Sequence, residues 1–304
     1  MGQHAVVAQV SPEGSVVDQI VYLNGEYVPL AEAKIPVLDR GFIFGDGVYE
    51  VIPAYGRTLF RLREHLARLE HSLRAIRIAN PHDTAAWSTL LQSVVARNPW
   101  DDQSVYLQVT RGVAPRTQEF PKGDVRPTVF VMASPLKMPT AEQRANGVAV
   151  VTRDDYRWRR CDIKSVSLLA NCLLRQEAED AGAVETILIR DGNVKEASTC
   201  NVFLVKNGVI LNPPKDNLIL HGITFDLALE LAREVGLPLE TREVKREELF
   251  DADEVWLSSS AREVLPVTTV DGKRVGNGKP GPVYARMFLL FQDYKARARA
   301  QAHA

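Results

Sequence analysis

A lysine with reactive potential stands at the junction between a predicted strand and a predicted helix. Lys164 lies in RWRRCDIKS, after the β-prone run 148–156 and before the apolar helical run 167–182. Only a neutral amine attacks a carbonyl group, and burial or a neighbouring cation favours that neutral form. Lys164 is therefore a candidate nucleophile toward a carbonyl compound. The alternative, from this segment alone, is an ordinary solvated lysine.

A carboxylate, Glu196, follows the next predicted hairpin in the segment KEASTCN. Three small residues come directly after it. A carboxylate in such a place can hold a protonated ring nitrogen, which keeps a pyridinium cationic so that it acts as an electron sink. The alternative is an exposed charge at the end of a strand.

Three further segments carry donors suited to an anion. Residues 221–224 (HGIT) open a predicted helix, with Thr224 as its N-cap and Gly236 just past its end, so backbone N–H groups are free there. Three serines, 258–260, end the predicted strand EVWLSSS and offer hydroxyls. Arg68 lies on the polar side of a predicted helix. The alternatives are capping and turn chemistry for the first two segments and a solvated arginine for the third.

The elements around these residues predict an α+β fold, because strands and helices mix without strict βαβ alternation. Asn-Gly or Asp-Gly pairs predict three hairpins, with turns at 24–25, 191–192 and 207–208. The run 37–60 is rich in aromatic and β-branched residues and predicts strands separated by sharp turns at its glycines. Periodicity predicts helices at 61–80, 83–97, 167–182, 222–236 and 282–298, and residues 112–125 are predicted to form a loop.

The chain divides into two predicted domains. Residues 20–135 form a small N-terminal α/β domain, 136–146 a linker and 147–304 a larger C-terminal domain, with an N-terminal extension at 1–19. The extension lacks a basic segment followed by a sustained apolar core, so we do not expect a signal peptide.

The composition of the 304 residues, with 45% hydrophobic and 25% charged, is that of an ordinary soluble globular protein. A formal net charge of -1 gives no electrostatic reason to expect nucleic acid or an anionic membrane as a partner. Three cysteines without a CxxC spacing favour a reducing compartment and indicate no metal site. We therefore expect a cytoplasmic protein.

Taken in order, six segments resemble the fold-type IV pyridoxal-phosphate aminotransferases over about residues 20–290. The segments are DRGFIFGDGVYE, FRLREHLARLEHS, CDIKSVSLLANCL, KEASTCNVF, LILHGITFD and SSSAREVLPV. The resemblance implies a two-domain α+β architecture with a cofactor cleft between the domains, the larger C-terminal domain binding the cofactor. It also implies that pyridoxal 5′-phosphate is the cofactor and that the protein is a homodimer.

The resemblance implies a role for each candidate residue. Lys164 resembles the Schiff-base lysine, which also moves the proton between Cα and C4′, and Glu196 the partner of the pyridine nitrogen. Leu220 would pack on the ring face away from the lysine. The phosphate would be bound by Arg68, Ile223, Thr224, Ser259 and Ser260.

The segments DRGFIFGDGVYEV and VTRGVAPRTQEFP most resemble the D-amino acid aminotransferases. In these proteins a tyrosine at the position of Tyr49 and an arginine at that of Arg116 hold the substrate carboxylate, the arginine's loop coming from the neighbouring subunit. Some relatives carry a histidine where this chain has Gln118, which carries no charge. We expect this change to cost one charge-assisted bond, about tenfold in affinity, unless Arg157, Arg159 or Arg160 compensates.

The implied reaction is a ping-pong transfer of the amino group from a D-amino acid of the D-alanine type to 2-oxoglutarate or pyruvate. Three other activities of the same fold stay open, namely branched-chain L-amino acid aminotransferase, R-selective amine transaminase and aminodeoxychorismate lyase. A catalytically silent binding protein is the alternative from a different class.

Overall fold

The structure, a computed structural model, describes residues 19–302. The predicted N-terminal extension therefore lies outside the described residues, except for Gln19. No helix between residues 19 and 302 combines the length and the apolar character needed to cross a bilayer.

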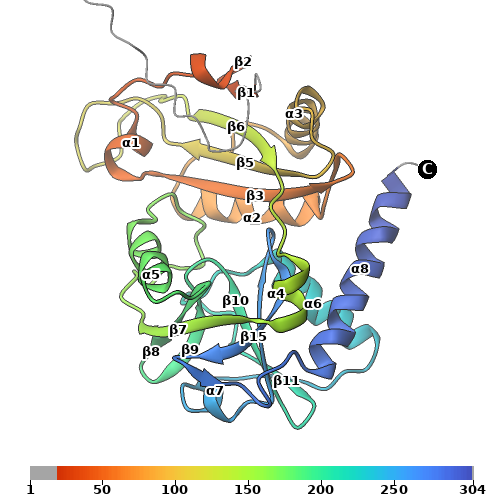
Figure 1. Cartoon of the computed structure of the whole chain (residues 1–304). Helices are drawn as coiled ribbons and strands as arrows, with labels where there is room; N and C mark the ends of the chain where they lie inside the picture. The colour runs from red at the N-terminus through yellow and green to blue at the C-terminus, as the bar shows by residue number, and fades with distance from the viewer. Residues whose placement is uncertain (1–18, 303–304) are drawn as a thin grey trace, which may run out of the picture.

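The first half of the described chain builds a six-stranded antiparallel sheet in the order β2-β1-β6-β5-β3-β4. Helices α2 and α3 pack on it, as Figure 1 shows, and bury Leu69, Leu73 and Leu91. Its elements are β1 (Ile20–Leu23), β2 (Glu26–Pro29), η1 (Leu30–Glu32), α1 (Arg40–Phe44), β3 (Gly47–Tyr55), β4 (Thr58–Leu59), α2 (Leu62–Ala75), α3 (Thr84–Arg97), β5 (Gln103–Thr110) and β6 (Thr128–Pro135).

The second half builds a ten-stranded mixed sheet in the order β12-β11-β10-β14-β15-β7-β8-β9-β13, with β16 paired to β15. Helix α6 packs on β14 and α8 over a core that includes Phe203, Phe225 and Trp256. The elements are α4 (Ala141–Asn146), β7 (Val148–Asp154), α5 (Leu169–Asp180), β8 (Glu185–Arg190), β9 (Asn193–Ala197), β10 (Asn201–Lys206), β11 (Val209–Asn212), α6 (Ile223–Glu234), β12 (Leu239–Thr241), β13 (Val244–Lys245), α7 (Glu248–Asp251), β14 (Glu254–Ser259), β15 (Glu263–Val270), β16 (Lys273–Arg274) and α8 (Pro282–Ala302).

Helix α8 runs from the larger sheet alongside the smaller one (Figure 1). The Phe60 ring, which precedes α2, lies 6.0 Å from the Phe291 ring and 5.7 Å from the Tyr294 ring on α8. Next to it Arg61 donates to Glu230 on α6 at 2.6 Å and 2.9 Å. These contacts fix the start of α2 against α6, so the two helices that carry predicted anion ligands are held together.

The α+β class and the three predicted hairpins are confirmed. At their turns Asn24, Asp191 and Asn207 have φ values of 50°, 52° and 51°. These left-handed values suit Asn and Asp and match the twist of the flanking strands. All five predicted helices are also present, each shifted by a few residues.

Two local predictions were wrong. Residues 40–44 form the helix α1 and not a strand, because Asp39 caps it by accepting from the Gly41 N–H at 2.8 Å. Thr224 is the second residue of α6 and not its N-cap, which is Gly222. The segment 136–146 stays a prediction as the linker between the domains, and it contains α4, which is closed by a reciprocal capping box between Thr140 and Gln143.

Candidate active site

A cavity of about 790 Å³ is lined by residues from both sheets. It brings together nine of the predicted residues: Tyr49, Arg68, Lys164, Glu196, Leu220, Ile223, Thr224, Ser259 and Ser260. Two predicted residues, Arg116 and Gln118, do not line it. Segments that are distant in sequence thus meet at one place. The exception is the loop 112–125, which carries Arg116 and Gln118 and is called the carboxylate loop below.

The main chain around Lys164 is fixed by the smaller sheet and by α2. Its carbonyl accepts from the Tyr49 N–H at 2.9 Å, and its N–H donates to the Ser72 hydroxyl at 3.2 Å. The Lys164 Nζ lies 4.2 Å from the centroid of the Tyr49 ring. Lys164 is therefore not the freely solvated lysine of the alternative interpretation, since its amine points at an aromatic face on the cavity wall.

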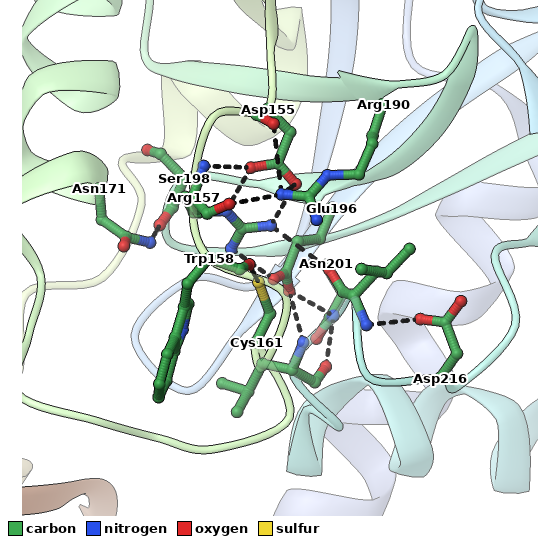
Figure 2. A network of polar contacts seen from close by, with 12 residues as sticks. Asp155, Arg157, Trp158, Cys161, Asn171, Arg190, Glu196, Ser198, Asn201 and Asp216 are labelled. Carbon is green, nitrogen blue, oxygen red and sulfur yellow. Dashed lines mark hydrogen bonds and ion pairs between the residues drawn. The ribbon is translucent and has the colours of Figure 1, made fainter.

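The Glu196 carboxylate is buried and lies within a polar network (Figure 2). Its Oε1 accepts from Arg157 at 2.7 Å, and its Oε2 accepts from the Leu220 N–H at 3.0 Å and from the Asn201 amide at 3.3 Å. Burial raises the pKa of Glu196, and the charge of Arg157 opposes that rise. Because the Glu196 carboxylate is buried, the alternative interpretation, in which it is an exposed charge at the end of a strand, is excluded.

Arg157 links Glu196 to a second buried carboxylate. Its Nε and one terminal nitrogen donate to Asp155 at 2.9 Å and 3.0 Å, and Arg190 lies 3.1 Å from the same carboxylate (Figure 2). Arg157 is therefore committed beside Glu196 and is not free to compensate for Gln118. Arg160 is paired with Asp162 at 3.0 Å. Our sequence reasoning missed this role of Arg157, although the Asp-x-Arg spacing was visible.

Arg68 is largely buried and is bound to Glu50 on β3, which contradicts the solvated arginine of the alternative interpretation. Its Nε and one terminal nitrogen donate to the two Glu50 oxygens at 2.8 Å and 2.7 Å, and its other terminal nitrogen donates to the His221 carbonyl at 2.9 Å. His65 lies 2.7 Å from Glu50. Burial by itself would raise the pKa of Glu50, but Arg68 and His65 lower it to about 2.

The start of α6 and the end of β14 form a second donor cluster in the cavity wall. Helix α6 begins without a side-chain cap, so its first N–H groups keep their capacity for an anion. A side chain on Gly222 would collide with the Asn201 amide oxygen, so glycine allows the close approach of this turn. Ser258, one of the three serines that the sequence offered as hydroxyl donors but not one of the predicted phosphate ligands, is buried with no hydrogen-bond partner for its hydroxyl among the described residues.

The loop that carries Arg116 and Gln118 lies beside α1. The Arg116 guanidinium carbon is 5.5 Å from the centroid of the Phe44 ring. The Gln118 carbonyl lies 3.5 Å from a terminal nitrogen of Arg40. Of the three predicted carboxylate ligands, Arg116 and Gln118 are thus outside the cavity of their own chain, whereas Tyr49 lines it.

A family model described as amino-transferase class IV matches residues 47–270. The chain belongs to this family. Cavity residues from Tyr49 to Arg262 all fall within the matched range. Family membership makes the chain a pyridoxal-phosphate-dependent transaminase, as the sequence predicted.

Individual class IV aminotransferases match nearly the whole chain. A D-alanine aminotransferase of Bacillus licheniformis is 45% identical over 273 residues, which is 90% of this chain and 96% of the relative. One of Staphylococcus haemolyticus is 37% identical, over 90% of this chain and 97% of the relative. The branched-chain amino acid aminotransferase of Escherichia coli superposes with a TM-score of 0.83 at 28% identity, over 90% of this chain and 93% of its own.

The cavity residues fit pyridoxal 5′-phosphate. Arg68 uses three of its N–H groups on protein acceptors, and a guanidinium has five, so two remain for a phosphate. The unpartnered Ser258 hydroxyl and the uncapped start of α6 supply further donors. Glu196 Oε1 accepts one bond from the protein, which leaves it a lone pair for a ring N–H.

Proposed function

We propose that this chain is a D-amino acid aminotransferase that moves the amino group of a donor of the D-alanine type to a 2-oxo acid such as 2-oxoglutarate or pyruvate. The observation that carries the proposal is the meeting of Lys164, Glu196 and Arg68 in one cavity. The similarity to D-alanine aminotransferases at 37% to 45% identity supports the choice of donor. We also propose that the enzyme works in the cytoplasm.

When bound, pyridoxal 5′-phosphate supplies a cationic ring that withdraws electrons from the donor's Cα. Lys164 would hold the cofactor covalently through Nζ and, once released, carry the proton from Cα as a base. Glu196 would hold the proton on the ring nitrogen. Burial raises the pKa of Glu196, but the charge of Arg157 opposes that rise and favours the carboxylate form that this role needs.

Arg68 and the start of α6 would hold the phosphate. The bidentate bond to Glu50 fixes the plane of the Arg68 guanidinium, so its free N–H groups have a set direction. Leu220 would pack on the ring, and its own N–H is bound to Glu196. One short turn therefore positions both the ring face and the ring-nitrogen partner.

We further propose that two copies of the chain form a dimer in which Arg116 of one subunit reaches the cavity of the other. Arg116 and Gln118 do not line their own cavity, although a carboxylate anchor is needed there. Exposed apolar side chains lie in this loop (Val113 and Phe120) and in the segment that leads into and forms the neighbouring α1 (Val37 and Phe42). Such a patch is suited to a second protein surface.

Subunit mixing tests the dimer. Lys164→Ala and Arg116→Gln are each expected to reduce activity as homodimers. After dissociation and reassociation of a mixture, each hybrid dimer contains one site with both native residues, so roughly a quarter of the wild-type site number should return. If mixing restores no activity while hybrids form, Arg116 does not act across the interface.

A donor panel tests the proposed reaction. Purified holoenzyme is given D-alanine, L-alanine, L-leucine or an R-amine, each with 2-oxoglutarate, and glutamate formation is measured. We expect turnover with D-alanine and far less with the others. Turnover with the R-amine would indicate an amine transaminase, and turnover of aminodeoxychorismate without any 2-oxo acid would indicate the lyase.

The second candidate is a branched-chain L-amino acid aminotransferase. Its support is the structural similarity to the Escherichia coli branched-chain enzyme, at a TM-score of 0.83. The identity of 28% is lower than that to the D-alanine aminotransferases. L-leucine as the best donor in the panel would favour this candidate.

A further inference from the structure

Arg40, the first residue of α1, is a buried arginine that holds the carboxylate loop. One of its terminal nitrogens donates to the Thr117 carbonyl at 2.6 Å, and the other lies 3.5 Å from the Gln118 carbonyl. These are the two residues directly after Arg116. The Phe44 ring lies against both arginines, with its centroid 4.7 Å from the Arg40 guanidinium carbon and 5.5 Å from that of Arg116.

The third guanidinium nitrogen of Arg40, Nε, joins this contact to the helix that carries Arg68. The Arg40 Nε donates to Asp46 at 2.8 Å, and Arg111 donates to the same carboxylate at 2.7 Å and 3.0 Å. Arg111 also donates to the Ile76 carbonyl at 2.6 Å and the Arg77 carbonyl at 3.0 Å, just after α2. A continuous chain of charged contacts therefore runs from the end of α2 to the loop.

The loop has little regular secondary structure. Between Val113 and Arg126 it forms only an isolated bridge, between Val113 and Asp39. Two backbone hydrogen bonds restrain its first part, from the Ala114 N–H to the Leu38 carbonyl at 3.3 Å and from the Thr117 N–H to the Pro115 carbonyl at 2.8 Å, and the Arg40 side chain adds its contacts to the carbonyls of 117 and 118. An arginine suits this task because its rigid fork can reach a carboxylate and two carbonyls together, whereas a lysine offers a single point of charge.

We propose that Arg40 is a positioning residue for substrate binding, which sets the conformation of the Arg116–Gln118 segment and so the grip on the donor's carboxylate. The inference rests on the proposed function, in which Arg116 holds that carboxylate. Arg40, like Arg116, does not line the cavity of its own chain. Its effect passes entirely through the segment that it holds.

The test is a double-mutant cycle on the donor's dissociation constant. Single-turnover kinetics of the holoenzyme with D-alanine, followed by cofactor absorbance, separate the dissociation constant from the maximal rate. We expect Arg40→Lys to raise the dissociation constant about tenfold, the cost of a lost charge-assisted bond, and to leave the maximal rate within about twofold. In the Arg116→Gln background the same change should have no further effect.

Arg57→Lys is the matched control. Arg57 also holds backbone carbonyls of the smaller domain but does not contact the loop. Its terminal nitrogens donate to the Trp100 carbonyl at 3.1 Å and to the Val95 carbonyl at 2.9 Å. The Arg57→Lys substitution should lower the melting temperature without raising the dissociation constant of the donor. If Arg40→Lys fails to fold, Phe44→Leu takes its place, with an expected rise of roughly twofold to fivefold that also vanishes in the Arg116→Gln background.

The outcomes separate the two claims. Wild-type enzyme that does not react with D-alanine overturns the proposed function. Wild-type enzyme that reacts, and is weakened by Arg116→Gln, keeps the function. In that case, the positioning role is overturned by either of two results. One is that the effects of Arg40→Lys and Arg116→Gln on the dissociation constant add fully, and the other is that Arg40→Lys lowers the maximal rate instead.

Discussion

Replacement of Glu50 by glutamine would leave the buried Arg68 without its counter-charge. The two side chains are 0% and 9% exposed, so solvent cannot take over the charge. The pKa of Glu50 is lowered from 4.5 to about 2, and each unit is worth about 1.4 kcal/mol. We therefore expect Glu50→Gln to lower the free energy of unfolding by about 3 kcal/mol at pH 7, in keeping with the cost of breaking a buried ion pair.

The pH dependence of this loss identifies its cause. A carboxylate with a depressed pKa stabilises the folded state fully above its unfolded pKa of about 4.5 and loses that effect as the pH falls toward 2. Urea unfolding of the wild type and of Glu50→Gln is measured at fixed protein and cofactor concentrations. The difference between their free energies of unfolding should be constant from pH 8 to pH 5 and should narrow below pH 4.5.

Glu64→Gln on the same helix as Arg68 is the control. Glu64 is paired with Arg61 at 3.2 Å but is 31% exposed, so its loss should cost less than about 1 kcal/mol. A Glu50→Gln effect as small as this, or one that does not change with pH, would refute the electrostatic account of the Arg68 site.

Two further predictions concern the other buried groups. Glu196→Gln should lower kcat with D-alanine roughly a hundredfold or more in steady-state assays, because the ring nitrogen loses its anionic partner. The control Glu243→Gln, which removes an exposed carboxylate, should leave kcat unchanged. Burial lowers the pKa of His65, so stability should fall as the pH drops below about 6.5. His65→Asn should flatten that part of the unfolding profile and the exposed His71→Asn should not, and an unchanged slope in His65→Asn would exclude His65 as its source.

The sequence predicted the elements with strong local rules. The Asn-Gly and Asp-Gly turns, the helical leucine spacing of α2 and the glycine after α6 each depend on neighbours within a few residues, and all three are present. The segment around α1 was misjudged because its structure depends on distant partners. The Asp39 carboxylate that caps it also accepts from the Thr110 and Thr128 hydroxyls, which come from β5 and β6.

In the candidate site, too, some features depend on local sequence and others depend on distant partners. The candidate residues followed from motifs and their order along the chain, but their partners did not. Glu50 meets Arg68 across 18 positions, and Arg157 meets Glu196 across 39. No local pattern links such pairs, because their contact depends on how strands and helices from different segments pack.

The decisive measurement of D-amino acid transamination is the half-reaction of the holoenzyme with D-alanine in the absence of any 2-oxo acid. We expect loss of the cofactor's near-visible absorbance and one pyruvate formed per active site, with neither change in Lys164→Ala. A bleached cofactor with L-leucine and an unchanged one with D-alanine would contradict it.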